Sequence, residues 1–232
     1  MELIWQGIVQ AFWLILRGDP EVMRIMWLSL SVSGIATLLS LVLGIPIGTA
    51  IGLTRFPGRS LVLSLVNTGM GLPPVVVGLF VSIFLWRSGP LGFLRLLYTP
   101  SAIVIAQFIL AFPVVTGLTV AAMQQIDPRL RMQLQGLGAS RLQVLRQLLW
   151  EARLAMLAAV MGGFGAVISE IGASMMVGGN ILGYTRVLTT ATVLETAKGN
   201  FDVAIALSVI LLAITFLINW GLTELQQLGA RR

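Results

Sequence analysis

The chain has 232 residues, of which 57% are hydrophobic and only 10% are charged. Soluble domains carry about 25% charged residues, so this composition excludes a monomeric water-soluble protein and makes lipid the solvent for most of the surface. The formal net charge is +6, and the absence of Cys and His excludes disulfides, Cys or His metal ligands and histidine base catalysis, so we expect no metal site and no cofactor.

The first predicted element is an apolar helix over residues 3–16, which is too short to cross a bilayer. Trp5 and Trp13 suit a helix that lies in the membrane interface. The chain then turns, and Asp19 can cap a helix that has Pro20 at its first position.

Five runs with almost no charged residue follow, and each is long enough for a membrane-spanning helix. The expected spans are 25–52, 61–86, 101–124, 154–177 and 203–225. We therefore expect an all-α membrane protein in which residues 1–232 form one five-helix domain. With the N-terminus outside, nine Lys and Arg residues lie on the inner side and six on the outer side, so the positive-inside rule favours a cytoplasmic C-terminus.

The second expected span contains Pro73 and Pro74, with Gly78 shortly after them. A proline inside a helix costs about 3 kcal/mol and frees carbonyl groups, which in lipid must be satisfied by neighbours or by cavity water. The pair therefore predicts a broken helix that faces the bundle interior. Its function is either to line or gate a path or to kink a packed helix.

The only long hydrophilic stretch is the loop over residues 125–153. Asp127 and Pro128 predict the start of a short helix, Gly138 its end, and Ser140 the cap of a second, amphipathic helix. The apolar face of that second helix is expected to hold Leu142, Leu145, Leu148, Leu149 and Ala152. An ordered connection of this length favours a binding partner over a solvated connector.

These residues carry a resemblance. The run Leu137-Gly138-Ala139-Ser140, after Asp127-Pro128 and before an amphipathic helix, resembles the cytoplasmic coupling loop of ABC-importer permeases, which docks on the ATPase subunit. The chain departs from the family pattern at Met132-Gln133-Leu134 and Trp150-Glu151. The ATPase-coupling residues that the resemblance implies are Asp127, Pro128, Leu137, Gly138, Ala139, Ser140 and Arg141.

The stretch from Ser169 to Ile181 is similar to the oxyanion branch of these permeases. The segments 71–79 and 183–201 resemble tungstate permeases more than molybdate or sulfate permeases. The resemblance implies the permease subunit of an importer for a tetrahedral oxyanion, with tungstate as the expected substrate and molybdate or sulfate as alternatives. A secondary transporter would usually show internal repeats and several ionisable groups at the bilayer midplane, whereas only Glu170 lies away from the ends of the expected spans.

Glu170 at the bilayer centre would cost about 2.5–3.5 kcal/mol, so its side chain should face the bundle or water. A carboxylate repels an oxyanion, which favours a hydrogen-bonded structural role over gating. We list as candidate path or gate residues Pro73, Pro74, Gly78, Glu170 and Asn180.

The resemblance also implies the assembly. It predicts a homodimer in the cytoplasmic membrane of a prokaryote, with two ATP-binding subunits and an extracytoplasmic oxyanion-binding protein, and no nucleic acid. A P-loop needs Gly-Lys-Ser/Thr, but the only lysine, Lys198, lies in Ala-Lys-Gly. We therefore expect that this chain is not an enzyme and that a separate subunit hydrolyses ATP.

Overall fold

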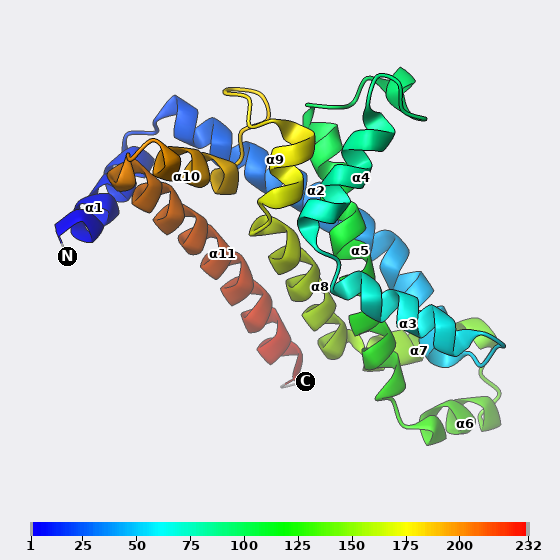
Figure 1. Ribbon diagram of the computed structural model, residues 1–232. Helices are drawn as coiled ribbons and strands as arrows, with labels where there is room; N and C mark the ends of the chain where they lie inside the picture. Colours follow the sequence, from blue (N-terminus) through cyan, green and yellow to red (C-terminus); the bar gives the residue numbers. More distant parts are fainter. Residues whose placement is uncertain (1, 231–232) are drawn as a thin grey trace.

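The computed structural model describes residues 2–230, with side chains described for residues 4–228. All regular secondary structure in that range is helical (Figure 1). The helices are α1 (Glu2–Leu16), α2 (Pro20–Leu53), α3 (Arg59–Met70), α4 (Pro74–Leu85), the 3-10 helix η1 (Gly92–Leu94), α5 (Pro100–Gln124), α6 (Pro128–Gly136), α7 (Arg141–Glu151), α8 (Arg153–Ile168), α9 (Gly172–Gly178), α10 (Leu188–Ala197) and α11 (Phe201–Ala230).

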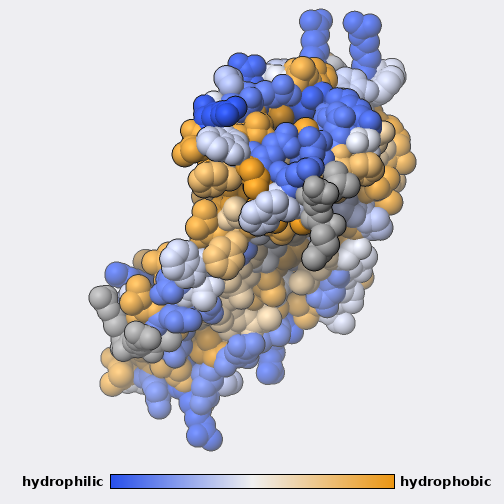
Figure 2. Space-filling model, turned by 90° about the vertical axis from the view of Figure 1, so that its left-hand side faces the viewer, coloured by the Kyte–Doolittle hydropathy of each residue, from blue (hydrophilic) through white to orange (hydrophobic). Residues whose placement is uncertain are grey.

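Three described helices, α2, α5 and α11, are long and apolar enough to cross a membrane. Two further pairs meet that test jointly but are bent, α3 with α4 by 99° and α7 with α8 by 65°, so the count rises to five if each pair is one span. In the view of Figure 2, hydrophobic side chains occupy the middle of the surface and hydrophilic ones gather toward its upper and lower ends. This is the distribution of a protein whose middle is in contact with lipid.

Helices α2 and α5 form the centre of the bundle because glycines on one face of α2 let the two backbones approach closely. A Cβ atom at Gly48 would lie 2.7 Å from the Thr116 carbonyl oxygen of α5. A Cβ at Gly52 would lie 2.7 Å from Cβ of Met123. A larger residue at either position would push the two helices apart.

Helices α1, α10 and α11 form a second group beside the centre (Figure 1). Their core contains Ala11 of α1, Leu188 of α10 and Ile210 of α11, packed with Ile25 of α2. At the far end of α11, the Gln226 amide donates to the Leu154 carbonyl of α8 at 3.2 Å. The opposite face of α11 exposes large apolar side chains, including Phe216 and Trp220.

The expected break at Pro73 and Pro74 is confirmed, since α3 ends at Met70 and α4 begins at Pro74. The expected span over 154–177 is interrupted: α8 ends at Ile168 and α9 begins at Gly172. The interruption has a physical cause in Glu170, whose carboxylate competes for the backbone N–H groups that a continuous helix would use.

Candidate functional site

The long polar loop is built as the sequence predicted, from two short helices joined by a turn. Asp127 begins α6, and its carboxylate accepts a hydrogen bond from the Arg129 N–H at 2.8 Å, with Pro128 at the first helical position. Ser140 begins α7 in a capping box with Gln143. In this box the Ser140 N–H donates to Oε1 of Gln143 at 2.7 Å. Both helix starts are fixed by local hydrogen bonds.

The turn between the helices requires a left-handed residue at Gly138, whose φ is +81°. The next N–H, that of Ala139, donates to the Leu134 carbonyl at 3.0 Å and so closes the end of α6. Among the described residues, no atom lies within 4 Å of the position that a Gly138 Cβ would take. The turn is therefore open to a partner, and within this chain a side chain there meets only backbone strain.

Large apolar side chains of this loop are exposed, and around the turn between its two helices these are Leu137, Leu142 and Met132, which are 85%, 75% and 62% exposed. We call these three residues the apolar tip. The expectation that Leu142 lies on the packed face of α7 is wrong, because that face is formed by the buried Val144 and Leu148. Exposed apolar groups gathered on an otherwise polar segment are typical of an interaction surface.

The loop is anchored to the ends of the central helices. Ala152, which follows α7, packs with Ala122 and Met123 of α5. The Arg131 guanidinium of α6 donates to the Leu53 carbonyl at the end of α2 at 3.4 Å. Only Ala152 separates α7 from α8, and the two helices meet at an angle of 65°.

At the other end of α8, Glu170 is 4% exposed and fully hydrogen-bonded. Its Oε1 accepts from the Ala173 N–H at 2.6 Å, and its Oε2 accepts from the N–H and the hydroxyl of Ser174 at 2.9 and 2.7 Å. The carboxylate thus satisfies backbone donors at the start of α9 that would otherwise be unpaired in lipid. The carboxylate is therefore hydrogen-bonded inside the bundle, as expected, and its structural role stays a prediction.

Two polar side chains that sequence reasoning did not single out complete the break between α8 and α9. The Gln107 amide of α5 donates to the Val167 carbonyl at 3.1 Å, and the Thr189 hydroxyl of α10 donates to the Glu170 carbonyl at 2.9 Å. The break between α8 and α9 is therefore hydrogen-bonded to both α5 and α10. The available signal for Gln107 was an amide inside an uncharged span, and Thr189 was one of several threonines in the outer loop over residues 178–201.

Helix α4 packs directly against α9. A Cβ at Gly78 would lie 2.8 Å from Cα of Ala173, and a Cβ at Gly172 would lie 2.8 Å from Cγ2 of Val75. The structure thus brings together three of the predicted path or gate residues, Pro74, Gly78 and Glu170, where the short helices α4 and α9 meet. Pro73, the residue before α4, adjoins this junction.

Asn180 does not join this junction. It lies beyond the end of α9 with a φ of +50°, and its amide donates to the Thr190 carbonyl of α10 at 3.4 Å. Nearby cations are paired with carboxylates: Arg186 lies 3.5 Å from Glu21, and Lys198 lies 2.7 Å from Glu195. The hydrogen bond from Lys198 lowers the pKa of the Glu195 carboxyl. The Arg186 Nε–H is buried and has no hydrogen-bond partner among the described residues.

Replacing Gly78 by Ala is expected to destabilise the protein by about 1–3 kcal/mol, because the new Cβ would overlap the backbone of α9. Thermal unfolding of the purified protein in detergent measures the effect. The matched control is Gly165→Ala in α8, where no described atom lies within 4 Å of the Cβ position. Equal unfolding temperatures for the two variants would contradict the close α4–α9 contact.

Comparison with known proteins identifies the family to which this chain belongs. Residues 44–227 match the family of binding-protein-dependent transport system inner membrane components. The chain is 40% identical over 227 residues to the tungstate uptake system permease protein TupB of Peptoclostridium acidaminophilum, which covers 98% of this chain and all of the relative. It is 43% identical over 196 residues to a probable anion ABC transporter permease protein of Haloferax volcanii, which covers 82% of this chain and 84% of the relative.

The molybdenum transport system permease protein ModB of Escherichia coli is less similar, at 28% identity over 92% of this chain and 98% of the relative. Among solved structures, the MetNI methionine ABC transporter in an inward-facing form matches with a TM-score of 0.74 and 19% identity, covering 91% of this chain and 98% of the other. That likeness establishes a type I importer fold. The chain therefore belongs to the family of binding-protein-dependent transport system inner membrane components, the multi-pass membrane permeases of prokaryotic ABC importers.

Proposed function

We propose that this chain is the permease subunit of an ATP-driven importer that carries tungstate across the cytoplasmic membrane. The observation that carries the proposal is the 40% identity to a tungstate permease over nearly the whole length of both chains. Molybdate or sulfate is the second candidate substrate, and the lower identity to a molybdenum permease places it behind tungstate.

The membrane arrangement that we propose has five spans, formed by α2, the bent α3–α4 pair, α5, α8 continued by α9, and α11. The N-terminus lies outside, and the coupling loop and the C-terminus lie in the cytoplasm. Helix α1 lies in the outer interface, where Trp5 and Phe12, 67% and 63% exposed, reach into lipid. The excess of arginine on the inner side supports this orientation.

The assembly that we propose is a homodimer bound to two ATPase subunits and an external binding protein. A single bundle packs its own centre tightly, so the translocation path lies between two copies. Each ATPase subunit contacts the apolar tip of one permease copy. The binding protein docks on the outer loop, where Arg186 and Lys198 remain paired with carboxylates.

In the mechanism that we propose, α8 transmits motion from the coupling loop to the Glu170 junction. Its 16 residues span about 24 Å between the coupling loop and the Glu170 junction. Closure of the ATPase pair moves the apolar tip, α8 transmits the displacement, and the contact between α4 and α9 opens or closes the path. Glu170 acts by holding α9 in place, with its charge occupied by backbone donors.

The purified chain alone is expected to hydrolyse no ATP, because it has no P-loop. With its ATPase subunit it should form a complex that hydrolyses ATP, at a rate that the isolated ATPase subunit does not reach. The measurement is phosphate release by the chain, the ATPase and the purified complex, each checked by mass spectrometry for contaminants. Turnover by the chain alone would overturn the division of labour.

A further inference from the structure

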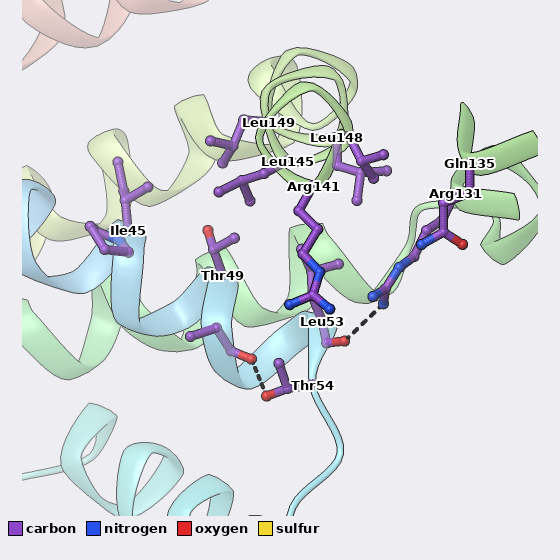
Figure 3. A pocket seen from close by; sticks show the side chains of 13 residues that line it. Ile45, Thr49, Leu53, Thr54, Arg131, Gln135, Arg141, Leu145, Leu148 and Leu149 are labelled. Atoms are coloured by element: carbon purple, nitrogen blue, oxygen red, sulfur yellow. Dashed lines mark hydrogen bonds between the residues drawn. The ribbon is translucent and has the colours of Figure 1, made fainter. Parts of the chain in front are cut away.

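A groove of about 640 Å³ lies beside the coupling loop, between the end of α2 and the buried face of α7 (Figure 3). Ile45, Thr49 and Leu53 of α2 lie along one wall, each four residues after the last. Leu145 and Leu149 of α7 lie along the other wall. The proposed coupling contact uses the apolar tip, and of the expected coupling residues only Arg141 also lines this groove.

One end of the groove is apolar and the other is cationic. Ile45 lies at the apolar end, and Arg131 and Arg141 extend toward the Leu53 end (Figure 3). Among the described residues that line the groove, none is acidic. Arg141 makes no hydrogen bond or ion pair within the described part of the chain, so its guanidinium is available to an anion.

The direction of the groove matches the depth of a lipid leaflet. The uncharged run of α2 extends through Thr54, and Arg55 is the first charged residue after it. The arginine end therefore lies at headgroup level, and Ile45 lies about 12 Å deeper along the helix. Between them, the hydroxyl of Thr49 is buried and has no hydrogen-bond partner among the described residues, which leaves a donor at the depth of the ester groups.

From this charge and depth complementarity we infer that the groove binds one anionic phospholipid of the cytoplasmic leaflet. The phosphate lies against Arg131 and Arg141, and one acyl chain lies along Ile45, Leu145 and Leu149. The groove lies between the cytoplasmic end of a spanning helix, α2, and the adjoining helix α7, and basic pockets at this level of a membrane protein are suited to such headgroups. The lipid would brace α7 against α2, beside the segment that passes motion to α8. The assignment of this lipid to the cytoplasmic leaflet rests on the proposed orientation of the chain. The binding of the lipid does not depend on which substrate is transported.

The test titrates the purified full-length chain in detergent with phosphatidylglycerol and with phosphatidylethanolamine of the same acyl chains, and measures bound lipid by native mass spectrometry. Wild type should prefer phosphatidylglycerol. Arg141→Gln should weaken phosphatidylglycerol binding about fivefold and leave phosphatidylethanolamine binding unchanged. Arg146→Gln is the control, because Arg146 lies on the same helix and does not line the groove. Equal lipid affinity in wild type and Arg141→Gln would overturn the inference.

A second variant tests the acyl-chain part independently. Ala50 is exposed and lines the groove, so Ala50→Trp fills space in the groove and leaves Arg131 and Arg141 unchanged in the sequence. This variant should lose tight binding of both lipids. Retained binding would contradict the groove as the site. In a third arm, the ATPase subunit is added to the lipid-bound chain; release of one lipid per chain would assign the groove to the ATPase and overturn the inference.

Discussion

Transport is expected to fall to background when Gly138 is replaced by Gln. The residue has a φ of +81°, so any side chain adds about 1–2 kcal/mol of strain to the turn. The chain itself offers no obstacle to the side chain, so the additional effect comes from contact with the ATPase. Because the turn lies outside the spans, insertion and dimerisation should be unchanged. The measurements are pull-down of the ATPase from solubilised membranes and uptake by the same cells.

Two matched variants separate strain from collision. Gly136→Gln adds the same side chain two residues earlier, at a helical position that also has no described atom within 4 Å. Gly138→Asn keeps a residue that tolerates the left-handed conformation. We expect Gly136→Gln to retain ATPase binding and Gly138→Asn to fall between wild type and Gly138→Gln. Normal pull-down and uptake by Gly138→Gln would remove the coupling assignment.

Loss of the Glu170 carboxylate is expected to produce the largest loss of stability. Glu170→Leu removes both acceptor oxygens and leaves the N–H groups of Ala173 and Ser174 unpaired, at about 1–3 kcal/mol each. Glu170→Gln keeps one acceptor but turns an amide donor toward one of these N–H groups. We therefore expect stability to fall from wild type to Gln and again from Gln to Leu.

Thermal unfolding and ATP-driven uptake should be measured on the same Glu170 preparations. Glu195→Gln is the control, because that carboxylate pairs with the exposed Lys198 and a Gln side chain can still accept the hydrogen bond from Asn200, so the change should cost about 1 kcal/mol. Transport should follow the amount of folded protein. A Glu170→Gln protein that unfolds at the wild-type temperature but does not transport would assign the charge itself to gating.

Local signals in the sequence were sufficient for the helix boundaries that depend on neighbouring residues. Asp127 and Ser140 cap the helices that follow them, and Pro73-Pro74 interrupts a helix wherever it occurs. The break after Ile168 was not predicted, because glutamate has no strong tendency to end a helix. Its effect depends on burial, which forces the carboxylate to take nearby N–H donors.

The candidate site was predictable to the extent that a motif marks it. The Leu137–Ser140 run predicted the turn between α6 and α7 without any structure, and the coupling role of this turn stays a prediction. The contact between Gly78 and Ala173 joins residues 95 positions apart in the chain, and the hydrogen bond from Gln107 to Val167 joins residues 60 apart. Such contacts are set by helix packing in three dimensions. The exposure of Leu142 also depended on which face of α7 turns toward the helix bundle, which helical spacing alone does not decide.

Uptake of tungstate by proteoliposomes that contain the permease, its ATPase and its binding protein tests the central claim most directly. We predict uptake only when all three proteins and ATP are present, with half-maximal uptake at a lower concentration of tungstate than of molybdate or sulfate. Vesicles with a non-hydrolysing ATPase variant are the control. An assembled complex that hydrolyses ATP and accumulates none of these oxyanions, or accumulates them without ATP, would contradict the proposal.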